Sequence, residues 1–178
     1  DQLLDNRTVA GYRERAAAGL TGEVVEIGFG SGLNVPAYPD GVTKVIAIEP
    51  STTARNLARE RVGATTIPIE FRGLDGQHLP LSDASADSAL STFTLCTIPD
   101  AGKALSELHR VLKPGGTFCF VEHGVSPNPR VSAWQNRLNP VQQRVAGGCN
   151  LNRRIDELVT NSGFEIQSLD TFEMPGPR

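Results

Sequence analysis

The run Val24-Val25-Glu26-Ile27-Gly28-Phe29-Gly30-Ser31-Gly32 is the most informative part of this sequence. Its apolar start is typical of a buried parallel strand, and it then carries glycine at alternate positions. Glycine adopts positive φ easily and lets the backbone come close to a ligand. A glycine loop between a strand and a helix therefore predicts a site for a nucleotide-like ligand. A dinucleotide fingerprint needs Gly-x-Gly-x-x-Gly, and Leu33 stands where its third glycine would be.

The composition limits the classes of protein that this chain can represent. Its 178 residues are enough for one domain, and 39% hydrophobic with 21% charged residues is typical of a globular protein. A net charge of −3 gives no support for a nucleic-acid partner, and no apolar run is long enough for an integral membrane segment. The oligomeric state stays open. The chain opens with Asp1 rather than Met, so we treat it as part of a longer protein.

The three cysteines, Cys96, Cys119 and Cys149, lie far apart and lack C-x-x-C spacing. Such a set argues against a disulfide framework and against a metal site. We therefore expect a cytoplasmic protein, with peripheral attachment to a membrane as the alternative.

Hydrophobic periodicity predicts alternating strands and helices. Strands are expected at 23–27, 44–49, 67–71, 87–93, 117–122 and 164–169. Helices are expected at 5–20, 52–62, 104–112 and 153–161, one or two short helices at 130–145, and a loop at 33–40. Asn150 or Asn152 would cap the last helix. This order predicts an α/β fold, with a doubly wound, mostly parallel Rossmann-like sheet.

Glu49 stands at the end of the second expected strand, 21 residues beyond Gly28. An acid at this place and distance accepts hydrogen bonds from ribose hydroxyls in doubly wound sheets. The alternative is an ordinary solvated carboxylate at a strand end. Thr94 likewise follows a strand, at the edge where open α/β sheets bind their ligands.

The pattern (D/E)-x-G-x-G-x-G, which starts at Glu26, resembles motif I of the class I S-adenosylmethionine-dependent methyltransferases. The resemblance implies that Gly28, Gly30 and Gly32 lie against the methionine part of the cofactor. It also implies that Glu26 helps to hold the loop and the amino group of the cofactor. The cofactor expected is S-adenosyl-L-methionine, with S-adenosyl-L-homocysteine as the product.

The same resemblance gives roles to two further groups of residues. Glu49, with Pro50 beside it, would bind the ribose. Asp75 would accept a hydrogen bond from the adenine amino group, with Gly76 and Gln77 offering backbone to the ring. For Asp75 the alternative is a turn, because Asp-Gly is a common turn pair.

Two later runs narrow the resemblance. Residues 79–116, which end in Leu-Lys-Pro-Gly-Gly, are similar to a block of the ubiquinone and menaquinone C-methyltransferases. Residues 120–153, with the run Gly-Gly-Cys-Asn-Leu-Asn-Arg, resemble the methyltransferase-like seven (thiol S-methyltransferase) family and its bacterial relatives. The resemblance implies a small-molecule acceptor, with a thiol favoured over an amine or a phenol. The seventh strand of such folds is expected to be absent from this chain or unobserved.

Residues that would bind the acceptor are less clearly marked. Methyl transfer from a sulfonium mainly requires positioning and exclusion of water, and a base only if the acceptor must lose a proton. His123 is the candidate base, with a structural histidine as the alternative. The candidate acceptor-binding residues are Tyr12, Arg130, Trp134 and Cys149.

We expect one domain over residues 1–178, in which residues 123–152 form an insertion that covers the site. Two other functions stay open. One is an NAD-dependent oxidoreductase, which Leu33 and the Leu-Lys-Pro-Gly-Gly run disfavour. The other is a non-catalytic module that binds S-adenosylmethionine.

Overall fold

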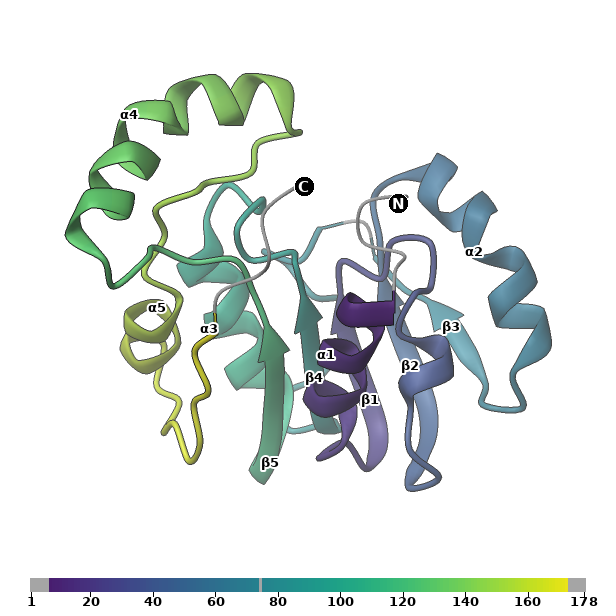
Figure 1. The fold of residues 1–178 in the computed structure, drawn as a ribbon. Coiled ribbons are helices and arrows are strands. Elements are labelled where there is room, and N and C mark those ends of the chain that lie inside the picture. Colours follow the sequence, from purple (N-terminus) through teal and green to yellow (C-terminus); the bar gives the residue numbers. More distant parts are fainter. Residues whose placement is uncertain (1–6, 74, 173–178) are drawn as a thin grey trace.

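A computed structural model describes residues 7–73 and 75–172, and its centre is a parallel sheet of five strands (Figure 1). The spatial order of the strands is β3-β2-β1-β4-β5. Their bounds are β1 Gly22–Ile27, β2 Val42–Ile48, β3 Ile69–Phe71, β4 Ala86–Thr92 and β5 Leu112–Val121. Since β4 returns to pair with β1, the winding reverses between these two strands, and a ligand crevice is expected there. The predicted fold class is confirmed.

Helices cover both faces of the sheet. Their bounds are α1 Arg7–Ala17, the short 3-10 helix η1 Val35–Ala37, α2 Thr52–Ala64, α3 Ala101–Val111, α4 Pro129–Val145 and α5 Ile155–Asn161. Val24, Val45 and Leu90 pack in one buried cluster with residues of α1 and α2. Val25, Ile46 and Ala89 pack in a second cluster with residues of α3 and α5. This alternation follows the pleat of the strands.

The Lys-Pro-Gly-Gly run lies inside β5. Helix α3 ends before it, as predicted, but the strand begins at Leu112 rather than at residue 117. The pairing with β4 shifts between Ala86 opposite Leu112 and Ser88 opposite Thr117. Gly115, with φ +80°, accommodates this irregularity.

The expected sixth strand, 164–169, is wrong: this segment has no regular secondary structure, bends at Gln167, and pairs with no strand in the described part of the chain. Its alternating apolar residues pack on the sheet and on α3 instead. The ring of Phe164 lies 5.1 Å from Phe118 and 5.2 Å from His109. Residues 173–178, the only part of the chain left for the start of a seventh strand, lie outside the described residues.

The expected cap of the last helix is also wrong. Helix α5 begins at Ile155 and its N-cap is Arg154. The amide of Asn150 donates instead to the Cys96 carbonyl oxygen, at 3.0 Å, and that of Asn152 to Asn136 Oδ1. Helix α2 does have a side-chain cap, since Ser51 Oγ accepts from the Ala54 N–H at 3.1 Å.

Replacing Leu108 by alanine tests the packing of α3 on the sheet. Leu108 is fully buried in the second cluster, so the change should lower the free energy of unfolding by about 2–5 kcal/mol. Urea unfolding followed by circular dichroism measures this loss. Leu57→Ala on α2, where the leucine is 56% exposed, is the matched control, and an equal loss in both variants would contradict the packing.

Candidate functional site

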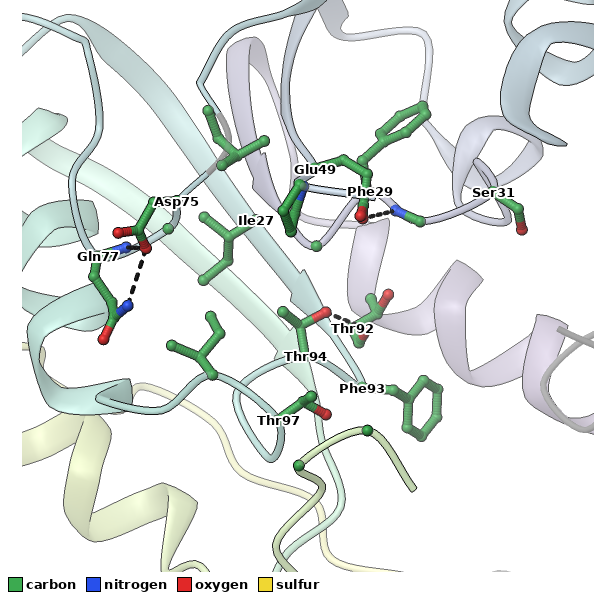
Figure 2. A pocket seen from close by; sticks show the side chains of 18 of the residues that line it. Ile27, Phe29, Ser31, Glu49, Asp75, Gln77, Thr92, Phe93, Thr94 and Thr97 are labelled. Atoms are coloured by element: carbon green, nitrogen blue, oxygen red, sulfur yellow. Dashed lines mark hydrogen bonds between the residues drawn. The ribbon is translucent and has the colours of Figure 1, made fainter. Parts of the chain in front are cut away.

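A cavity of about 540 Å³ opens at the carboxyl edge of the sheet, where the winding reverses (Figure 2). The segments that follow β1, β2, β3 and β4 all contribute to its lining. The predicted residues that line it are Gly28, Gly30, Glu49, Pro50, Asp75, Gly76, Gln77 and Thr94. The structure therefore brings together most of the predicted cofactor residues from four separate parts of the chain.

Two glycines of the loop serve different purposes. A Cβ on Gly28, which has φ +71°, would lie 2.1 Å from Thr94 Oγ1, so only glycine lets the loops after β1 and β4 meet. A Cβ on Gly30, with φ +59°, would have only the Gly28 carbonyl oxygen nearby, at 3.8 Å. The backbone at Gly30 is thus open to the cavity and can lie directly against a ligand.

Glu49 holds the glycine loop against the end of β2. Its Oε2 accepts a hydrogen bond from the Gly30 N–H at 2.8 Å, and its Oε1 accepts from the Ser51 N–H at 2.7 Å. Each carboxylate oxygen has a second lone pair, so these bonds leave room for further donors. The carboxylate is buried yet borders the cavity, an arrangement suited to hydroxyl groups of a ligand.

Asp75 forms the predicted turn and also borders the cavity. Its Oδ1 accepts from the Gln77 N–H at 2.8 Å and from Gln77 Nε2 at 3.0 Å. These hydrogen bonds lower the pKa of Asp75. Figure 2 shows Asp75 and Gln77 together, set apart from the labelled residues of the glycine loop. The turn gives this carboxylate a fixed place at the cavity.

Glu26 is fully buried and does not line the cavity. Its Oε1 accepts from Asn34 Nδ2 at 2.8 Å, and its Oε2 accepts from the Tyr38 hydroxyl. Burial raises the pKa of Glu26 to about 7. Gly32 is also absent from the lining, since its α-carbon faces the ring of Phe29.

Arg13 of α1 is a cavity residue that sequence analysis did not identify. Its guanidinium Nη1 donates to Asn34 Oδ1 at 2.8 Å and to Thr92 Oγ1 at 2.5 Å. Its spacing could have indicated this burial, because Arg13 stands four residues from both Val9 and Ala17 on the buried side of the helix. A buried arginine on an apolar helix face needs partners, and these link α1 to β4.

Glu122 shapes the site from the end of β5, a role that sequence analysis also did not identify. Its Oε1 accepts from Ser91 Oγ at 2.7 Å, from the Thr94 N–H at 2.9 Å and from the Leu95 N–H at 3.0 Å. The residue is half-buried, and the burial of its carboxyl group raises the pKa of Glu122. The loop after β4 is thereby fixed next to the glycine loop.

The methyltransferase domain family matches residues 25–120. The chain belongs to this family. The match covers the glycine loop, Glu49, Asp75 and Thr94, and it favours the methyltransferase interpretation over the oxidoreductase alternative.

Curated relatives differ in the acceptor that they methylate. A thiol S-methyltransferase of Rattus norvegicus is 33% identical over 156 residues, which cover 84% of this chain and 64% of the relative. A phosphatidylethanolamine N-methyltransferase of Cereibacter sphaeroides is 33% identical over 116 residues, which cover 62% of this chain and 57% of the relative. The chain thus spans less than two thirds of the length of either protein.

Among solved structures, an S-adenosylmethionine-dependent methyltransferase of Mesorhizobium loti has a similar fold. The TM-score is 0.70 with 20% identity, over 93% of this chain and 84% of that one. At this identity the likeness shows the fold alone.

In this methyltransferase domain, the predicted acceptor-side residues lie outside the cavity lining. Tyr12 stacks on Phe172 with ring centroids 4.1 Å apart. Trp134 is 62% exposed, and Arg130 lies in the first turn of the same helix. Cys149 follows Gly147 and Gly148, which do line the cavity and which sequence analysis did not identify. The acceptor roles of these four residues stay predictions.

His123 follows β5 and is half-buried. Its Nδ1 is buried and has no hydrogen-bond partner among the described residues. Burial lowers the pKa of His123, so its imidazole is neutral at neutral pH and able to accept a proton. Like the other acceptor-side candidates, it is not part of the cavity lining.

The raised pKa of Glu26 predicts a pH dependence of stability. Its pKa rises from 4.5 to about 7 on folding, so its contribution is fully present below pH 4.5 and is lost as the pH rises through 7. This shift corresponds to about 3 kcal/mol. The free energy of unfolding of the native protein should therefore fall by about this amount relative to Glu26→Gln between pH 4.5 and pH 8. Urea unfolding at several pH values measures the difference, and parallel curves for the two proteins would refute it.

Proposed function

We propose that this protein transfers the methyl group of S-adenosylmethionine to a small-molecule acceptor, in the first place a thiol. The observation that carries the proposal is the cavity at the winding reversal, bordered by an open glycine loop, by Glu49 and by Asp75. Membership of the methyltransferase domain family supports the reaction. The thiol S-methyltransferase relative supports the acceptor.

The residues at the cavity fit this cofactor. The volume lies in the range of small-molecule sites, roughly 300–1,000 Å³. Gly30 leaves its backbone open, and Glu49 offers carboxylate lone pairs to hydroxyl donors. Further residues that would hold the cofactor are Gly28, Pro50, Asp75, Gly76, Gln77 and Thr94. Glu26 and Gly32, which do not line the cavity, would act indirectly by fixing the glycine loop.

When bound, S-adenosylmethionine supplies a methyl group that its sulfonium has already activated. The chain then has to orient the acceptor and keep water away from it. Ile27, Phe93 and Ile98 give the cavity apolar walls. Gly147 and Gly148 close one part of its rim, which supports the interpretation of residues 123–152 as a cover over the site.

A thiol acceptor must be a thiolate to attack, and two routes lead to it. An alkyl thiol with a pKa of about 8.5 is partly ionised near neutral pH without any base. A neutral histidine can also remove the proton, and the lowered pKa of His123 supports it as that base. An amine acceptor is the second candidate, because a relative methylates phosphatidylethanolamine.

Replacing Glu49 by alanine tests the cofactor site. Ligand hydroxyls would lose a charged acceptor, so affinity for S-adenosylhomocysteine should fall by about 1–3 kcal/mol. Isothermal calorimetry measures this. Glu60→Gln, at an exposed position of α2, is the control and should bind as the native protein does.

Three results would count against the proposal. Unchanged affinity in folded Glu49→Ala would remove Glu49 from the site. Binding of NAD as tight as that of S-adenosylhomocysteine would support the oxidoreductase alternative. If the cofactor binds but no thiol, amine or phenol is methylated, the chain is a binding module.

Replacing His123 by alanine tests the base. Methylation of an alkyl thiol should slow most near neutral pH and recover at high pH, where the thiolate forms without help. Rates measured from pH 6.5 to pH 9.5 give the profile. An aryl thiol that is already ionised at neutral pH is the matched control, since its rate should not change. An equal deficit at every pH, or for both thiols, assigns His123 a structural role.

A further inference from the structure

Helix α4 turns a polar face towards the rest of the protein. Gln135 accepts from the Ser126 N–H at 2.8 Å and donates to the Gly124 carbonyl oxygen at 3.2 Å. Asn139 Oδ1 accepts from the Leu151 N–H at 2.7 Å, and Gln143 Nε2 donates to Asn150 Oδ1 at 2.5 Å. No residue of α4 is buried. Amide hydrogen bonds therefore attach this helix where apolar packing would be usual.

The apolar residues of α4 face solvent instead. Their spacing alternates between three and four residues, which places them in one stripe along the helix. The stripe consists of Val131, Trp134, Leu138, Val141 and Val145, which are 43% to 75% exposed. A continuous exposed stripe of large apolar residues marks a surface that binds a partner.

The charges beside the stripe are all positive. Arg130, Arg137 and Arg144 recur every seven residues and so follow one flank of the helix. Residues 129–145 contain no aspartate or glutamate, although the whole chain has a net charge of −3. Arg137 also lies over the Trp134 ring, 5.9 Å from its centroid. Apolar and aromatic residues beside arginines are typical of a helix that lies in a membrane interface.

We propose that α4 docks on the surface of an anionic lipid bilayer, with its apolar stripe at the boundary of headgroups and acyl chains. Charge complementarity selects this occupant. Two α4 stripes packed together would bring six arginines into one interface with no acidic residue of α4 to balance them. An anionic bilayer provides both the apolar layer and the balancing charge. Among the described residues no helix is long and apolar enough to cross a membrane.

Docking by α4 has a consequence for the cavity. The helix contains Pro140 and is bent in Figure 1, and Ala146 joins its end to Gly147 and Gly148 of the cavity rim. Figure 1 shows α4 beyond the carboxyl ends of the strands. The residues that line the cavity follow these same strand ends. The rim is therefore near the headgroup layer in the docked protein. If the proposed function holds, acceptors that partition into the bilayer reach the cavity directly from the headgroup layer.

Trp134 is the only tryptophan of the chain, so its fluorescence reports on the stripe directly. The complete chain is titrated with phosphatidylcholine vesicles, with or without phosphatidylglycerol. We expect a blue shift of the Trp134 emission, and quenching by bromine-labelled lipids, only with the vesicles that contain phosphatidylglycerol. Added salt should weaken the binding. Changing Arg130, Arg137 and Arg144 together to glutamine should lower the partition coefficient roughly 100-fold.

Matched variants distinguish lipid binding by the stripe from nonspecific adsorption of the protein to vesicles. Leu138→Ser with Val141→Ser should reduce binding while Trp134 still reports. Leu57→Ser with Arg59→Gln, an exposed leucine and arginine of α2, should bind as the native protein does. Far-UV circular dichroism verifies that each variant is folded.

Three results would overturn the proposal. The first is unchanged emission of the native protein with anionic vesicles. The second is a blue shift without lipid that accompanies dimerisation in the analytical ultracentrifuge, which would assign the stripe to a second copy. The third is binding to polyglutamate as tight as to vesicles, which would indicate an acidic protein partner. None of these measurements needs methyl transfer, so a failure here is distinct from a failure of the proposed function.

Discussion

The buried carboxyl group of Glu26 is the constraint on which the site depends. Burying such a group is unfavourable unless hydrogen bonds satisfy it, and Asn34 and Tyr38 provide them. Asn34 in turn accepts from Arg13, so helix α1 and the segment before β2 are tied to the end of β1. Burial raises the pKa of Glu26 to about 7, because its effect exceeds that of the hydrogen bonds from Tyr38 and Asn34, which lower the pKa. The glycine loop above it therefore has a fixed support.

Two further carboxylates repeat this principle at neighbouring strand ends. The backbone N–H groups of loops that leave parallel strands have no strand partner and need acceptors. Glu49 accepts from Gly30 and Ser51, and Glu122 accepts from Thr94 and Leu95. The cavity is thus held open by charge-assisted hydrogen bonds from both sides. A ligand would find loops that are already ordered, which lowers the entropy lost on binding.

The sequence predicted what local pattern determines. Apolar runs located all five strands and the acid at the end of the second one, Glu49, while Asp75 was predicted from the family resemblance. Both residues border the cavity, because the carboxyl ends of parallel strands share an edge. Arg13, Glu122 and Gly147 come from distant segments, and only tertiary folding brings them to the site. The supposed sixth strand had the alternation of a strand, but a segment without regular structure on a core surface has the same pattern.

Helix α4 shows that periodicity gives the spacing of an apolar stripe but not the direction in which the stripe faces. The spacing of its apolar residues is visible in the sequence, and Trp134 was a candidate for the acceptor side because residues 123–152 were expected to cover the site. Gln135, Asn139 and Gln143 lie on the side of α4 that faces the rest of the protein, because they form hydrogen bonds with residues 124–126 and 150–151. These partners lie in the loops that flank α4, and the sequence alone does not identify them. Because those amides attach the helix from its polar side, the apolar side is free to bind elsewhere. The same segment can then cover the cavity through Gly147 and Gly148 and meet a membrane through Trp134.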